Sequence, residues 1–120
     1  MDIYKIVKLG VFSLFLLNFI KAGEIEYYWS GAVTSESAVI SFATDKKAKI
    51  KIQYSDSKNF KKNKLYTKVT SIDEKSNFFA KDQLKNLKPN QTYYYRFNIN
   101  GTLKKDQVGK FKTHSNKPFS

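Results

Sequence analysis

Hydrophobic and polar side chains alternate along most of the chain after residue 24, and two segments show the alternation most clearly. In Ala48–Tyr54 every second residue is apolar, with lysine or glutamine between. In Thr92–Ile99 every second position from Tyr93 onward holds Tyr, Tyr, Phe and Ile in turn. The positions between them hold Tyr, Arg and Asn. A period of two residues is typical of a strand with one face in the core. Both segments are therefore predicted to be half-buried β-strands.

Shorter segments of similar character precede and follow these two strands, and polar turns separate them. No segment has a convincing helical period, so the chain is predicted to be an all-β sandwich with Greek-key connections. A break in the last strand is expected at Gly109. Asp82 falls on an apolar face, so either a bulge turns it outward or it lies at the sandwich edge. The five further strands expected are Ile25–Val33, Ala38–Ala43, Leu65–Ile72, Phe78–Leu84 and Leu103–Thr113, which gives seven in all.

The turn before the aromatic strand carries a recognisable arrangement of Leu87, Pro89 and Tyr93. Pro89 fixes its own φ and ends the preceding element, and Asn90 tolerates the left-handed backbone that such turns need. A Leu-x-Pro turn that leads into an aromatic strand resembles the tyrosine corner of fibronectin type III and immunoglobulin-like sandwiches. On this resemblance Tyr93 is the corner residue, and its hydroxyl is expected to bond backbone near residues 84–87.

Tyr94 and Arg96 lie on the opposite, outward face of the same strand. A solvated sheet face is the simpler interpretation. An aromatic residue beside an arginine on a flat face is also a candidate docking patch for a partner. The two residues are therefore carried forward as a candidate docking face.

Residues 1–22 have the anatomy of a Sec-type signal peptide. Lys5 and Lys8 precede an apolar run from Leu9 to Ile20, and Ala22 is the best cleavage residue. The run is short for a bilayer span, although an uncleaved anchor is the alternative. The sequence thus predicts an exported protein, in the periplasm, at the cell surface or secreted, with no stable membrane insertion after cleavage. Residues 23–113 then form one sandwich domain, and residues 114–120 a tail.

The formal charge of +12 raises the question of nucleic-acid binding. All but one of the 22 basic residues are lysines, and Arg96 is the exception. Nucleic-acid readers commonly use arginine for bidentate contacts, and these lysines are scattered over strands and turns. We expect no nucleic-acid partner. A binder of anionic polymers stays a weaker hypothesis that rests on charge alone.

The residues of a catalytic or metal site do not gather anywhere in the sequence. The chain has one histidine, His114, and no cysteine, and its carboxylates fall mostly in predicted turns. Metal sites need several such ligands together. We therefore expect no catalytic residue, no metal ligand and no cofactor-binding residue in this chain.

A more specific resemblance rests on motifs spread from residue 25 to residue 113. They are the runs Trp29–Ser35, Ser37–Ile40, Ile50–Ser55, Leu87–Phe97 and the Gly-x-Phe-x-Thr motif at Gly109–Thr113. In this order they resemble the N-terminal domain of alkaline phosphatase D-like enzymes, which is similar to the N-terminal sandwich of purple acid phosphatases. Asn90 stands where glycine is common.

The resemblance implies a non-catalytic sandwich of an exported phosphatase, with a metal-dependent catalytic domain as partner in cis or in trans. That domain would be expected to bind divalent metals. Its metal ligands match nothing here, so the chain is interpreted as a truncated or split copy that ends about where the first catalytic strand begins. The alternative is a free-standing secreted module that binds a protein or a cell-surface polymer.

Overall fold

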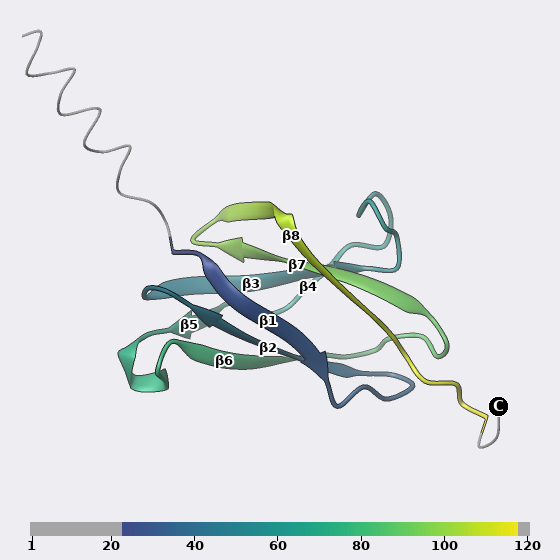
Figure 1. The fold of residues 1–120 in the computed structure, drawn as a ribbon. Helices are drawn as coiled ribbons and strands as arrows, with labels where there is room; N and C mark the ends of the chain where they lie inside the picture. The colour runs from purple at the N-terminus through teal and green to yellow at the C-terminus, as the bar shows by residue number, and fades with distance from the viewer. Residues whose placement is uncertain (1–22, 118–120) are drawn as a thin grey trace, which may run out of the picture.

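The computed structural model describes residues 23–117, which form two antiparallel β-sheets stacked as a sandwich (Figure 1). The signal peptide expected at residues 1–22 lies outside the described residues. The described chain enters and leaves at opposite ends of the sandwich (Figure 1). The predicted all-β sandwich is confirmed.

The first sheet has three strands in the order β1 (Ile25–Gly31), β2 (Ala38–Thr44) and β6 (Phe79–Leu84). β1 ends because Ala32 takes a positive φ of 46° and leaves the strand conformation. The Thr34 hydroxyl then closes the turn into β2 by accepting the backbone N–H of Ser37 at 2.9 Å. β2 is almost wholly buried because it is the central strand of this sheet.

The second sheet has the order β4 (Leu65–Tyr66), β3 (Ala48–Ser55), β7 (Thr92–Ile99) and β8 (Thr102–Lys112). A further short strand, β5 (Thr70–Ile72), also pairs with β3. The Asn100-Gly101 hairpin of this sheet has φ values of 50° and 90°, the positive pair that a tight two-residue turn between strands requires. A short 3₁₀ turn at Glu74–Ser76 links β5 to β6.

The core lies between the two sheets and is built from the predicted inward positions. The apolar residues of Ala48–Tyr54 and the alternate residues from Tyr93 to Ile99 are all buried. Aromatic rings meet edge to face across the layer, as Tyr28 of β1 does with Phe97 of β7 at 5.4 Å between ring centres. Such aromatic pairs stabilise a core beyond the area that they bury.

The segment predicted as one strand at Leu65–Ile72 is two short strands. The interruption lies at Thr67, whose hydroxyl accepts the backbone N–H of Ile52 at 2.9 Å. The Thr67 N–H donates to the Ile52 carbonyl at 2.9 Å. A side chain thus takes the place of one backbone acceptor, and the regular ladder stops for three residues.

The break predicted at Gly109 was wrong in its position. Gly109 pairs regularly with Tyr95, and the register shift in β8 lies instead between Leu103 and Val108. There Gln107 leaves the pairing and donates its side-chain amide to the Ile25 carbonyl at 2.9 Å. Gly109 occupies its position because a Cβ there would strike the ring of Tyr95.

Asp82 lies at the edge of the sandwich, which decides between the two alternatives for this residue. The pairing of β2 with β6 runs from Ala38 to Ala43 without a bulge, so the carboxylate faces inward. Thr70 of β5 donates its hydroxyl to the carboxylate at 2.9 Å and 3.0 Å. Burial raises the pKa of Asp82, and the bond from Thr70 lowers it by less. An inward charge at an edge strand opposes pairing with other chains.

Candidate interaction surfaces

The predicted tyrosine corner has the following geometry. Tyr93 is buried, and its hydroxyl accepts the backbone N–H of Lys88 at 2.8 Å. Lys88 lies one residue beyond the 84–87 segment in which the partner was expected. Leu87 is buried under the turn, Pro89 is half-buried, and Asn90 has the left-handed φ of 53°. The turn is therefore held by one side chain of the strand that it leads into.

Thr113, at the end of the Gly-x-Phe-x-Thr motif, joins the same corner to the last strand. Its buried hydroxyl donates to the Lys88 carbonyl at 2.5 Å and accepts the N–H of Gln91 at 2.9 Å. The next residue, His114, donates its backbone N–H to the Thr34 carbonyl at 3.0 Å. The motif thus has a structural reason at each position, since Gly109 admits the Tyr95 ring and Phe111 stacks on Tyr93 with ring centres 5.9 Å apart.

Tyr94 and Arg96 share the outward face of β7, but Arg96 is already engaged within the chain. Its Nε donates to the Gln53 side-chain oxygen at 2.6 Å, and its guanidinium lies 4.0 Å from the centre of the Phe60 ring. Gln53 in turn donates to the Tyr66 hydroxyl at 2.7 Å. Sequence reasoning could not foresee this arrangement, because Gln53 and Phe60 are distant from Arg96 in the sequence.

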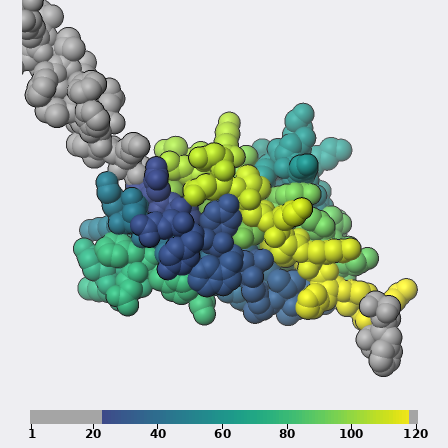
Figure 2. Space-filling view, in the orientation of Figure 1, coloured from purple at the N-terminus to yellow at the C-terminus, as the bar shows by residue number. Residues whose placement is uncertain are grey.

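Sequence reasoning missed a cluster of rings on the outer face of the three-stranded sheet, formed by the exposed Tyr27 and Trp29 and the half-buried Phe79, which we call the aromatic patch. Tyr27 and Trp29 are 50% and 47% exposed, and their rings stack 5.6 Å apart at an interplanar angle of 15°. Phe79 lies 6.0 Å from Trp29. In the space-filling view the atoms of β1 lie uncovered toward the viewer, beside those of β8 (Figure 2).

The pairing of the strands explains how the patch forms. Tyr27 pairs with Ala43, which pairs with Phe79, and Trp29 pairs with Ser41. Small residues on the central strand thus leave room for large rings from both neighbours. The signal available in the sequence was the alternation of Tyr27 and Trp29 around the inward Tyr28, combined with Ser41 and Ala43 opposite them.

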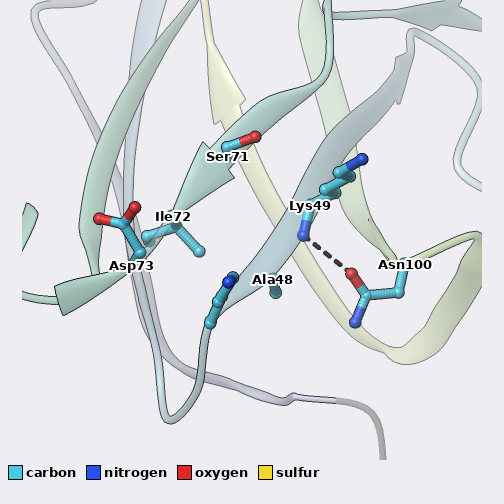
Figure 3. A pocket seen from close by; sticks show the side chains of 7 residues that line it. Ala48, Lys49, Ser71, Ile72, Asp73 and Asn100 are labelled. Carbon is cyan, nitrogen blue, oxygen red and sulfur yellow. Dashed lines mark hydrogen bonds between the residues drawn. The ribbon is translucent and has the colours of Figure 1, made fainter. Parts of the chain in front are cut away.

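The outer face of the other sheet is cationic. Shallow hollows lie along the start of β3, and the walls of one of about 300 Å³ hold two lysines, an asparagine, a serine and an aspartate beside Ala48 and Ile72 (Figure 3). Lys49 donates its backbone N–H to the Asn100 side-chain oxygen at 2.8 Å, which fixes the orientation of that amide (Figure 3).

Burial raises the pKa of Tyr95 to about 12, so this core tyrosine stays protonated. Within residues 23–117, no three His, Cys, Asp or Glu side chains gather closely enough to hold a metal ion. The same part of the chain contains no helix long and apolar enough to cross a bilayer.

The fold and the corner define a fibronectin type III-like sandwich, and comparisons with known proteins agree. A solved human fibronectin type III domain superposes with a TM-score of 0.56 at 14% identity, over 78% of this chain and 75% of that one. The family model for the PhoD-like phosphatase N-terminal domain matches residues 29–115. The chain therefore belongs to that family, as its motifs indicated, and is its non-catalytic β-sandwich domain.

Solved structures extend the comparison. A structure of PhoD matches with a TM-score of 0.60 and 24% identity, over 72% of this chain and 18% of PhoD. The chain thus spans about a fifth of that protein. A sensor domain of the anti-sigma factor RsgI4 from Pseudobacteroides cellulosolvens matches with a TM-score of 0.58 and 25% identity, over 82% of this chain and 93% of that one. The comparison with curated proteins gave no match.

Proposed function

We propose that this chain is an accessory domain that docks onto the catalytic domain of a PhoD-like phosphatase, in cis or in trans. The observation that carries the proposal is the aromatic patch, a flat and uncovered cluster on a domain of this family. We further propose that the chain is exported through residues 1–22. Divalent metal ions would then bind to the catalytic domain alone.

The composition of the patch favours a protein partner. Tryptophan and tyrosine are enriched among the residues that contribute most to binding energy in interfaces. Trp29 already stacks on Tyr27 and lies at a tilt against Phe79, so little side-chain freedom remains to be lost on docking. A rigid apolar surface of this kind is suited to burial against a second domain.

The alternative face is less suited to this contact. Arg96 is bonded to Gln53 and stacked on Phe60, so a partner would have to compete with bonds within the chain. Lysines lie beside Tyr94 on the same face, and lysine is depleted in the centres of interfaces. We therefore assign the docking contact to the three-stranded sheet and not to Tyr94 and Arg96.

The test is a titration of the purified chain with a separately produced PhoD-like catalytic domain, followed by calorimetry. Wild type should bind, and Trp29→Ser should weaken binding at least tenfold, the scale of a central interface residue. Leu65→Ser is the matched control, because Leu65 is also an exposed apolar residue, 43% exposed, but lies on the other sheet. Equal losses for both variants, or no binding by wild type, would contradict the proposal.

A free-standing binding module is the second candidate function. It is supported by the similarity to the RsgI4 sensor domain, most of which this chain covers. In that case the chain would fail to bind the catalytic domain and would bind a polymer or another protein instead.

A further inference from the structure

The outer face of the five-stranded sheet carries several positive side chains, and no acidic residue is paired with any of them in the described sheet. Outward positions on the neighbouring strands β3, β7 and β8 hold cations. The residues that pair with these cations on the adjacent strand are neutral. Asp106 falls in the irregular part of β8, outside this pairing. We call this surface the cationic face, and its charged members are Lys49, Lys51, Arg96, Lys110 and Lys112.

The positive groups on β3 form a row. Lys49 and Lys51 stand two residues apart on one side of the strand, a separation of roughly 6.5 Å. A hollow of about 410 Å³ lies beside them and is lined as well by Asn98, Asn100 and Val69. It shares Lys49 and Asn100 with the hollow at the start of β3, so the two are adjacent. Asp73, in the wall of the hollow at the start of β3, accepts the N–H of Lys75 at 2.9 Å.

The amide groups in the row are partly oriented in advance. Asn100 accepts the Lys49 N–H through its side-chain oxygen, which fixes which end of its amide is the nitrogen (Figure 3). Asn98 pairs with Lys51 across β3 and β7, and both residues line the same hollow. The face thus repeats a lysine on β3 with an asparagine in or just after β7.

We propose that the cationic face binds an extended acidic polysaccharide laid along β3. Its carboxylates would lie on the lysines, and its hydroxyl groups on the two asparagine amides. The charge of the face complements a polyanion, and the row of adjacent hollows fits a linear chain better than a compact ligand.

The rings on this face argue against single-stranded nucleic acid. Binding of single strands depends on bases that stack on free aromatic side chains. Here the Tyr66 ring has the Lys51 ammonium 5.1 Å from its centre, and the Phe60 ring has the Arg96 guanidinium at 4.0 Å. The chain's own cations therefore occupy one face of each of these two rings.

The experiment measures binding of the full chain to polygalacturonate at low salt, by biolayer interferometry. The probes for comparison are neutral dextran, single-stranded DNA and vesicles with anionic lipid. We expect binding to polygalacturonate that weakens as salt rises, and none to dextran. The double variant Lys49→Gln/Lys51→Gln should weaken the affinity at least tenfold.

The matched control is Lys85→Gln/Lys88→Gln, which removes the same charge from two exposed lysines on the connection between β6 and β7. It should change the affinity less than twofold. Equal losses in the two double variants would overturn the proposal, because they would show that net charge alone is responsible. Absence of binding by wild type, or tighter binding to DNA or to vesicles than to polygalacturonate, would also overturn it.

Discussion

Gly109 should tolerate no side chain at all, because the Tyr95 ring lies directly over it. A Cβ at Gly109 would place three atoms of the Tyr95 side chain closer than 3.0 Å. Tyr95 is 2% exposed and in contact with Tyr28, Phe97 and Phe111, so its ring has no space to move into. Overpacking of a core costs about 1–3 kcal/mol, and we expect Gly109→Ala to lie at the upper end.

The assay is urea denaturation followed by circular dichroism, with a thermal melt as a second measure. A loss of about 3 kcal/mol corresponds to a fall in Tm of roughly 12–24 °C for a domain of this size. Gly31→Ala is the matched control, since a Cβ at Gly31 meets nothing within 4 Å and its φ is not positive. That variant should be neutral or slightly more stable than wild type.

A double-mutant cycle separates the clash with the ring from other effects of the substitution. Placed on Tyr95→Leu, Gly109→Ala should cost less than about 1 kcal/mol, because the ring is gone. Placed on Tyr95→Phe, it should keep its full cost, because ring carbons remain in the contact. A Gly109→Ala variant as stable as Gly31→Ala would refute the steric explanation of the glycine in the Gly-x-Phe-x-Thr motif.

Three further predictions concern stability. Tyr93→Phe should lower the free energy of unfolding by about 1–2 kcal/mol, because the Lys88 N–H loses its buried acceptor, and an unchanged urea midpoint would show that the corner bond is dispensable. Thr113→Val should cost at least as much, since the hydroxyl serves both Lys88 and Gln91, and the same urea titration measures it. The pKa of Asp82 is raised in the folded state, so the folded chain holds this proton more tightly than the unfolded chain, and ionisation of Asp82 costs stability as pH rises above the unfolded value. Asp82→Asn should therefore become more stable relative to wild type between pH 3 and pH 7, and a difference that is constant with pH would contradict the inward placement of the carboxylate.

Local alternation in the sequence was enough to predict the strands that build the core. The apolar side of Ala48–Tyr54 and the aromatic side of Thr92–Ile99 both face inward, because each strand has one buried face and its period cannot slip without exposing that face. The position of Gly109 in the fold was not readable in the same way. A residue without a side chain is required there because Tyr95 lies on the neighbouring strand. Sequence reasoning instead attributed the glycine to a break in its own strand.

The surfaces were harder to predict than the core because they, like the role of Gly109, depend on residues from other strands. The aromatic patch depends on β1, β2 and β6 lying side by side, and β6 is distant in the sequence from the other two. The engagement of Arg96 depends on Gln53 and Phe60, which only the tertiary fold brings to it. A pattern read along one strand shows which way a side chain points, but not which neighbours it meets.

The most direct test of the central claim uses Trp29, which is the only tryptophan in the chain. The chain is labelled with 5-fluorotryptophan, and its single fluorine resonance is followed by NMR as a PhoD-like catalytic domain is added. If the aromatic patch is the docking contact, the resonance shifts and broadens with the titration, and solvent access to the ring falls. The same change should occur with Lys49→Gln/Lys51→Gln, which alters the opposite face. A resonance that stays unchanged while calorimetry shows the two domains binding would contradict the account.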